Sequence, residues 1–204
     1  MKKQLYFTVI LLMLTLVLLV GCHSNQSMSS PAVKVGDVII TNQQVEDRLQ
    51  YTQILDRIYQ TWLPQAYGEN IPDAVQKETA LATDRDAVLK QMIRYEVVNQ
   101  YREKNGRLYG ETEAKQEAER NLQSLRKDTL YEQALQESLA YYNLSTEDFL
   151  ALSYSVTYDT YNYSTEESLY KTENGQIATD DTALTQSFET FVDQLVEQTE
   201  VEYF

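Results

Sequence analysis

The spacing of hydrophobic and polar positions changes character near residue 41. In residues 32–41, valines and isoleucines flank a Gly-Asp pair in short runs, which predicts a small β-hairpin. Thr41, with Gln44 three residues later, forms a capping-box pattern, so we expect a helix to begin there and to run to about Trp62. Its apolar stripe recurs at helical spacing and consists of Val45, Leu49, Leu55, Ile58 and Trp62.

Helical spacing recurs further along the chain, after an interruption. Residues 63–82 contain two prolines and a glycine, and we expect a loop or a broken helix there. The later helices are expected at residues 83–104, 111–126, 128–142, 149–170 and from Asp180 or Asp181 onwards. The pattern leaves open whether 111–126 and 128–142 form two helices or one bent helix.

The carboxy-terminal part combines a strong core stripe with a final strand. A polar linker is expected at residues 171–179. The last helix carries apolar residues at helical spacing, namely Leu184, Phe188, Phe191 and Leu195. Residues 199–204 alternate between acidic and apolar or aromatic positions, which predicts a short strand. With only 6 glycines and 3 prolines, the composition disfavours a turn-rich all-β fold, and the expected class is mainly α.

The amino-terminal segment has a different pattern. Lys2 and Lys3 precede an apolar run over residues 6–20, and the run ends in Leu-Val-Gly before Cys22. This arrangement resembles the signal peptide and lipobox of bacterial lipoproteins. The resemblance implies that residues 1–21 are removed and that Cys22 is acylated. An uncleaved membrane anchor, or a plain signal peptide with an incidental cysteine, are the alternatives.

These patterns divide the chain into three parts. Residues 1–21 form the signal peptide, 22–32 the lipidated cysteine and a flexible tether, and 33–204 a single helical domain. The domain is expected to lie outside the cytoplasm, held on the bacterial cell membrane by the lipid on Cys22.

The charge balance restricts the partners. The chain has 17 basic and 31 acidic residues, and loss of Lys2 and Lys3 with the signal peptide leaves a formal charge of −16. Such a charge favours solubility and argues against nucleic acid or anionic lipid as a partner. The sequence does not indicate an oligomeric state.

Three stretches of the chain resemble the SurA and PrsA chaperone family. They are the Ile-Thr start of the first helix, the run LKQMIRYEVVNQYREKNG at residues 89–106, and the run ALQESLAYYNLSTEDFLALS at residues 134–153. The resemblance extends over residues 33–204 and implies a multi-helix SurA N-terminal-like domain. It also implies that the final strand, residues 200–204, packs back on the hairpin at residues 33–40. We expect no parvulin-type isomerase domain, which many family members carry, because the helical part takes up residues 33–204.

Catalytic patterns are not found in the sequence. The single histidine, His23, lies in the expected tether, and the single cysteine is the expected lipidation site. No Cys–His pair, Ser–His–Asp set, zinc-ligand pattern or glycine-rich phosphate loop is available. We therefore expect no enzymatic activity, no metal and no cofactor.

A run of tyrosines marks the candidate binding site. Tyr154, Tyr158 and Tyr161 share one stripe of the helix at 149–170, apart from a second apolar stripe on the same helix. The stripe is interpreted either as aromatic packing inside a bundle or as a surface for unfolded polypeptides, to which tyrosine is well suited. Trp62 is a further candidate, although its place on an apolar stripe favours the core.

The sequence thus predicts a lipid-anchored chaperone-like protein that binds unfolded or secreted polypeptides. The alternative is a lipoprotein dedicated to one envelope partner, in interaction or assembly. A receptor for a small extracellular ligand is a third and weaker hypothesis.

Overall fold

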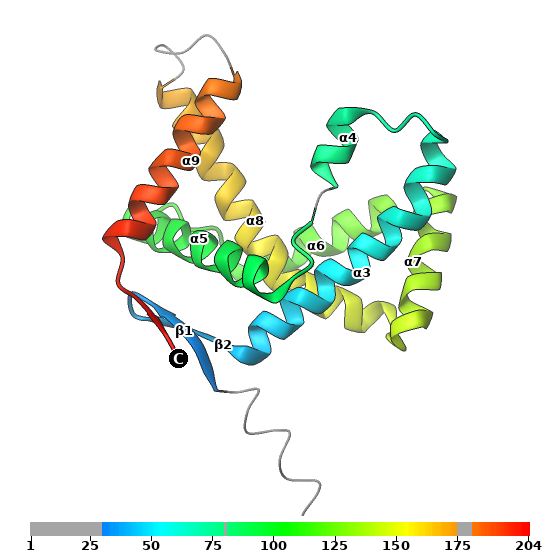
Figure 1. Cartoon of the computed structure of the whole chain (residues 1–204), viewed down its shortest axis with the longest axis horizontal. Coiled ribbons are helices and arrows are strands. Elements are labelled where there is room, and N and C mark those ends of the chain that lie inside the picture. The colour runs from blue at the N-terminus through cyan, green and yellow to red at the C-terminus, as the bar shows by residue number, and fades with distance from the viewer. Residues whose placement is uncertain (1–29, 80, 175–180) are drawn as a thin grey trace, which may run out of the picture.

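The computed structural model describes residues 30–79, 81–174 and 181–204. The expected signal peptide at residues 1–21, Cys22 and residues 23–29 of the expected tether lie outside the described residues, as does Asp180. The described part contains seven helices and a three-stranded sheet (Figure 1). The elements are β1 (Pro31–Val35), β2 (Val38–Thr41), α3 (Asn42–Tyr67), α4 (Asp73–Glu78), α5 (Arg85–Lys104), α6 (Glu111–Leu125), α7 (Thr129–Tyr142), α8 (Thr146–Asn174), α9 (Asp181–Gln198) and β3 (Val201–Tyr203). Helices α3 and α5 pack against the sheet. The predicted fold class, mainly helical with a small hairpin near the start and a carboxy-terminal strand, is confirmed.

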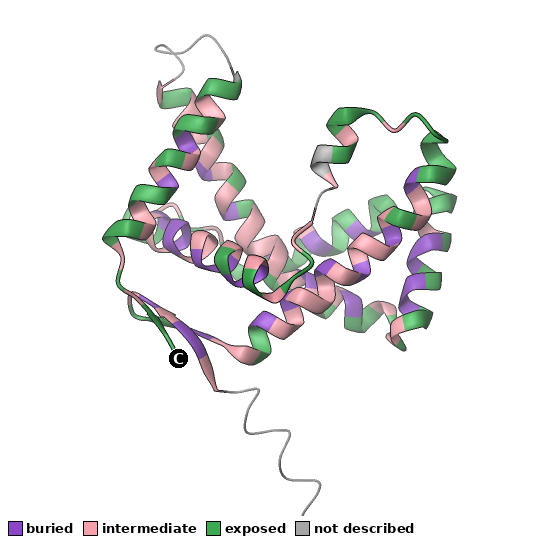
Figure 2. Ribbon diagram, in the orientation of Figure 1, coloured by how far each residue is buried: buried purple, intermediate pink, exposed green. Residues whose placement is uncertain are grey.

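The sheet joins the two ends of the described chain. Its order is β2-β1-β3, and both pairings are antiparallel. Val33 of β1 pairs with Tyr203 of β3, and the Phe204 N–H donates a hydrogen bond to the Ala32 carbonyl at 3.1 Å. The prediction that the final segment packs back on the hairpin is therefore confirmed. Figure 2 shows β1 largely buried and β3 largely exposed, as expected for a central and an edge strand.

The start of α3 follows directly from the sequence. The Gln44 N–H donates to the Thr41 hydroxyl at 3.2 Å, and the Thr41 N–H donates to the Gln44 side-chain oxygen at 2.8 Å. These two bonds form the predicted capping box. At the other end, α3 continues past Trp62 to Tyr67, with Pro64 inside its last turn.

The remaining boundaries differ in detail from the expectations. The interrupted region contains the short helix α4, and Asp84, one residue after the expected Thr83, caps α5. Helices α6 and α7 are separate, because Asp128 caps the start of α7. Its carboxylate accepts hydrogen bonds from two backbone N–H groups. Helix α8 extends to Asn174, through the first part of the region expected to be a linker.

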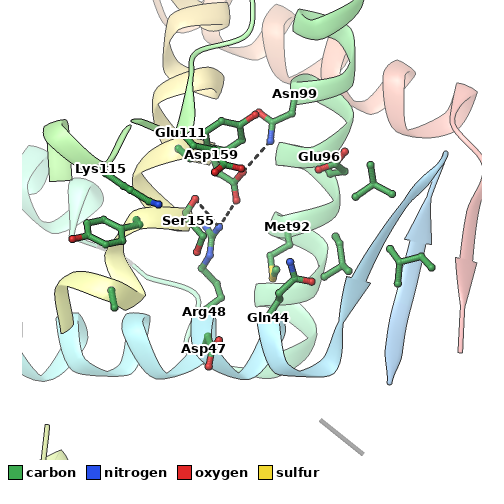
Figure 3. A pocket seen from close by; sticks show the side chains of 16 residues that line it. Gln44, Asp47, Arg48, Met92, Glu96, Asn99, Glu111, Lys115, Ser155 and Asp159 are labelled. Carbon is green, nitrogen blue, oxygen red and sulfur yellow. Dashed lines mark hydrogen bonds and ion pairs between the residues drawn. The ribbon is translucent and has the colours of Figure 1, made fainter. Parts of the chain in front are cut away.

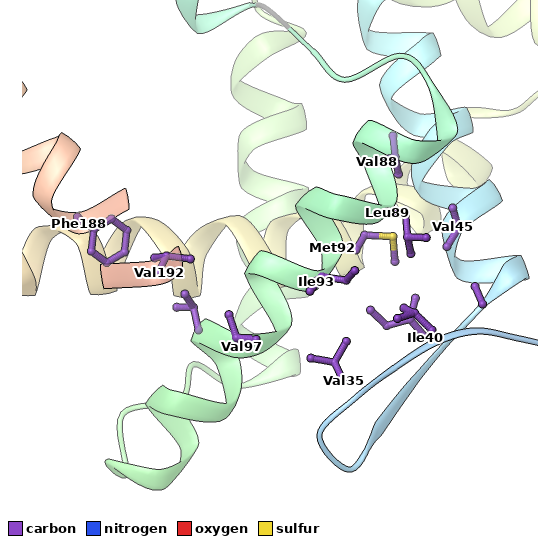
Figure 4. Close-up of a cluster of buried hydrophobic side chains, with 13 residues drawn as sticks. Val35, Ile40, Val45, Val88, Leu89, Met92, Ile93, Val97, Phe188 and Val192 are labelled. Atoms are coloured by element: carbon purple, nitrogen blue, oxygen red, sulfur yellow. The ribbon is translucent and has the colours of Figure 1, made fainter. Parts of the chain in front are cut away.

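Two core clusters hold the helices together. The first core cluster lies where α5 meets the sheet, the start of α3 and α9 (Figure 4). Its fully buried members include Val33, Val35, Val45, Phe188 and Val192. Since α9 contributes two of these residues, the last helix belongs to the core, as its apolar stripe predicts.

The second core cluster lies between α3, α6, α7 and the start of α8. Ile54, Ile58, Tyr131, Leu135 and Phe149 are its largest buried members. Helix α7 packs against α3, and α6 packs along α8. In the described part of the chain, no helix combines the length and the apolar character that crossing a membrane requires.

Candidate functional site

Two cavities lie on different sides of the crossing between α3 and α8. The first, here called the hairpin pocket, has a volume of 460 Å³ and opens between β2, α3, α5, α6 and α8 (Figure 3). Val38 and Ile39 of β2, Met92 of α5, and Tyr154 and Tyr158 of α8 form its apolar wall. Val38 and Ile39 are both exposed, so this wall presents apolar surface to water.

A polar bridge forms the floor of the hairpin pocket. Arg48 of α3 donates a hydrogen bond to the carboxylate of Asp159 on α8 and a longer one, at 3.4 Å, to the Ser155 carbonyl (Figure 3). Asn99 of α5 donates from Nδ2 to the other Asp159 oxygen at 2.9 Å. Burial raises the pKa of the Asp159 carboxyl, while Arg48 and Asn99 oppose that rise by stabilising the anion. The bridge joins three helices in the interior.

The rim of the hairpin pocket carries charges. Asp47, Glu96 and Glu111 contribute carboxylates, and Lys115 contributes an ammonium group. The Lys115 nitrogen lies 5.8 Å from the centre of the Tyr154 ring, close enough for a cation–π interaction. Burial raises the pKa of the Glu96 carboxyl, and a hydrogen bond from Gln100 partly counters this effect. The pocket thus has an apolar wall and a rim in which negative charge dominates.

The second cavity, here called the tyrosine groove, is larger. It has a volume of 730 Å³ and lies between α3, α5, α6, α7 and α8. Its lining is rich in aromatic side chains, namely Tyr51, Tyr59, Tyr95, Tyr131, Phe149 and Tyr161. Tyr51 stacks on Phe149 with ring centres 5.2 Å apart. Burial raises the pKa of the Tyr51 and Tyr131 hydroxyls, so both stay neutral at physiological pH.

The structure separates the residues that the sequence grouped together. Tyr154 and Tyr158 line the hairpin pocket, whereas Tyr161 lines the tyrosine groove and stacks on Tyr109 at 4.0 Å. Helix α6 packs along α8 between the two cavities, with Lys115 lining the pocket and Ala118 lining the groove.

Trp62 lines neither cavity. Its indole N–H donates a hydrogen bond to Asp128 at 3.1 Å, and its ring meets Tyr131 edge to face. It packs against the second core cluster, the place that its apolar stripe favours.

Several groove residues were not identified from the sequence. Tyr51 and Tyr59 of α3 each lie four residues from Leu55, a member of the predicted apolar stripe, so helical spacing could have added both tyrosines to that stripe. Arg48 and Asn99 gave no signal, because a single polar residue in a helix does not reveal which partner it meets. Among the described residues, no group of three or more histidine, cysteine or acidic side chains is arranged to hold a metal ion.

Comparison with known proteins identifies the family. The family model that describes the SurA-like N-terminal domain matches residues 1–153. This range contains β1 through α7 and the first turns of α8, and so includes most of the residues that line the two cavities. No curated protein and no solved structure matches the chain. With three quarters of its length matched, the chain belongs to the family of SurA-like N-terminal domains.

Proposed function

We propose that this protein is a lipid-anchored, extracytoplasmic chaperone-like protein that binds unfolded or secreted polypeptides without catalysis. The observation that carries the proposal is the tyrosine groove, a 730 Å³ cavity whose walls combine aromatic and aliphatic side chains with hydroxyl and amide groups. Membership of the SurA-like family supports the same reading.

The chemistry of the groove suits reversible binding of apolar segments. Tyrosine offers a large apolar face, a polar tip and few torsions that become fixed on binding. Leu125 at the groove is 45% exposed, and Tyr161 is also exposed, so a bound segment would cover apolar surface that now meets water. A volume in this range accommodates a few side chains and not a folded domain.

The amino-terminal segment supports the proposed location. The lipobox pattern that ends at Cys22 would place the domain at the outer face of the cell membrane, where secreted chains emerge. The formal charge of −16 that remains after loss of residues 1–21 would keep a complex with an unfolded chain soluble.

Suppression of aggregation tests the binding function. The full chain, incorporated in lipid nanodiscs, is mixed with two unrelated unfolded proteins, and light scattering follows their aggregation. We expect the parent to suppress aggregation of both, and the Tyr161→Ser/Leu125→Ser variant to lose most of this effect. Both positions are exposed, so the variant should keep the fold, which circular dichroism checks.

A matched control uses Tyr141, which is 66% exposed on α7 and lines neither cavity. Tyr141→Ser should suppress aggregation as the parent does. If the parent has no effect on either unfolded protein, general polypeptide binding is excluded. The function to test next is then the dedicated envelope partner, by crosslinking in the native membrane.

Lipidation is tested separately. In cells fed radioactive palmitate, the parent should carry label and sediment with membranes, whereas Cys22→Ser should carry none. Label in the Cys22→Ser variant would place the lipid elsewhere, and an unlabelled parent would contradict the lipoprotein assignment.

A further inference from the structure

We propose that the hairpin pocket binds a lysine or arginine side chain of the polypeptide, with the alkyl stem along the apolar wall and the cation among Glu96, Asn99 and Tyr158. This inference rests on the proposed polypeptide-binding function and adds a preference for basic segments. It concerns the hairpin pocket, whereas the tyrosine groove takes apolar segments.

The first argument is a buried acceptor without a donor. Asn99 is only 6% exposed, and its Oδ1 has no hydrogen-bond partner among the described residues. The orientation of this amide follows from its surroundings, because Nδ2 donates to the Asp159 carboxylate. Asn99 lines the hairpin pocket, so a donor arriving there would satisfy Oδ1.

The second argument is a carboxylate without a cation. Glu96 is half-buried on the same face of α5, one turn before Asn99. It accepts a hydrogen bond from Gln100 at 2.8 Å, but no basic side chain in the described ranges forms an ion pair with it. Half-buried carboxylates are strengthened by a charged donor, which an ammonium or guanidinium group supplies.

The third argument is the balance of charge around the pocket. Arg48 and Asp159 neutralise each other at its floor, although Arg48 Nε itself has no hydrogen-bond partner in the described part of the chain. The rim then holds Asp47, Glu96 and Glu111 against Lys115, which lies at the Tyr154 ring. The remaining negative potential favours a cationic group.

Tyr158 lines the same pocket as Glu96 and Asn99, and its aromatic face can attract a cation. Burial raises the pKa of its hydroxyl, and the neighbouring charges of Asp159, Glu96, Glu111 and Glu103 raise it further, in keeping with the negative charge around it. The charged head of the bound side chain is therefore placed among Glu96, Asn99 and Tyr158.

The apolar wall explains why the bound side chain is expected to be a long one. Ile39 is 50% exposed and Val38 is also exposed, and Met92 lies deeper in the same pocket. Lysine and arginine carry an apolar stem that covers such a surface while the head reaches polar groups. A short polar side chain would leave the apolar wall uncovered. A purely apolar side chain would leave the polar groups of the pocket without a partner.

A pair of peptides tests the proposal. Each is a ten-residue extended peptide with a neutral fluorophore, identical except that a central lysine is replaced by norleucine, which keeps the stem and loses the charge. Fluorescence anisotropy measures Kd with the full chain in nanodiscs made of zwitterionic lipid. We expect the lysine peptide to bind roughly fivefold or more tightly than the norleucine peptide, with the preference decreasing at high salt.

Variants assign the preference to the pocket. Glu96→Gln preserves the shape of the side chain and should abolish the preference for lysine. Glu137→Gln, an exposed acid on α7 across the molecule, is the control and should retain it. Tyr158→Leu should weaken binding of the lysine peptide more than binding of the norleucine peptide.

Three results would overturn the inference. They are equal binding of the two peptides, a lysine preference that persists in Glu96→Gln, and competition by free spermidine as effective as that of the lysine peptide. If the parent still suppresses aggregation in these cases, the proposed function stands and only the preference for basic segments falls. If neither peptide binds and aggregation is unaffected, the proposed function falls as well.

Discussion

Arg48 illustrates how much a single residue contributes to this fold. Its guanidinium lies between α3 and α8, is almost fully buried and pairs with Asp159. The same guanidinium lies 5.7 Å from the centre of the Tyr95 ring. Because both cavities use Arg48 in their lining, its position affects the shape of both.

Breaking this pair should be costly for stability. Asp159→Leu leaves the Arg48 charge buried without a counter-charge, and we expect a loss of about 3 kcal/mol in the free energy of unfolding. The double variant Arg48→Met/Asp159→Leu removes both charges and should recover a large part of that loss. Urea denaturation of the two variants and the parent gives the comparison. A double variant less stable than Asp159→Leu alone would contradict this account.

At the scale of elements, helix boundaries that depend on neighbouring residues were predictable. Helix boundaries that extend into regions of tertiary contact were not. The capping box at Thr41, which the sequence predicted, depends on neighbouring residues only. Helix α8 continues beyond its predicted end to Asn174, and there Glu173 forms an ion pair at 3.8 Å with Arg107 from the segment before α6. The polar sequence after Tyr170 contains no sign of that contact, so it suggested a linker.

The cap of α3 permits a quantitative prediction. Thr41→Ala removes the side-chain acceptor of the capping box and should cost about 1 kcal/mol. For a chain of this size the melting temperature should fall by roughly 2–4 °C. Thr41→Ser keeps the hydroxyl and should melt close to the parent in a calorimetric scan. Equal melting of Thr41→Ala and the parent would show that the cap does not limit stability.

The start of α7 should make stability depend on pH. Hydrogen bonds from the Tyr131 and Leu130 N–H groups and from Trp62 lower the pKa of Asp128, although partial desolvation opposes them. A lowered pKa in the folded state means that ionised Asp128 stabilises the fold above the unfolded-state pKa. This contribution is lost as pH falls through the folded-state pKa.

Asp128→Asn tests this effect, since asparagine also caps helices but carries no charge. The parent should melt higher than the variant at neutral pH, and the difference should shrink below about pH 4. Melting curves followed by circular dichroism from pH 7 to pH 2 measure it. A difference that stays constant over this range would rule out a role for the charge.

At the scale of the whole molecule, the candidate site could be predicted only in part. The sequence placed Tyr154, Tyr158 and Tyr161 on one stripe of a single helix, and all three belong to α8. It could not show that α6 packs along α8 and leaves Tyr161 in a different cavity. Which helix covers a given stripe depends on the path of the whole chain. The periodicity within one helix does not identify the covering helix.

The carboxy-terminal elements should be indispensable for folding. Deleting residues 185–204 removes Phe188 and Val192 from the first core cluster and β3 from the sheet. We expect the truncated chain to lose its cooperative melting transition. Deleting only Phe204, which is exposed, should preserve that transition. A cooperative melt in the longer truncation would show that the helices fold without the closing strand.

Because β1 lies in the middle of the sheet, the sheet can be completed only after the last strand has been synthesised. Its two neighbours are β2, which follows at once, and β3, which is made after all seven helices of the described chain. Until β3 has been synthesised, one edge of β1 therefore lacks its partner, and open strand edges invite pairing with other chains. During that interval, the protein that we propose binds unfolded chains is itself incompletely folded and has an open strand edge.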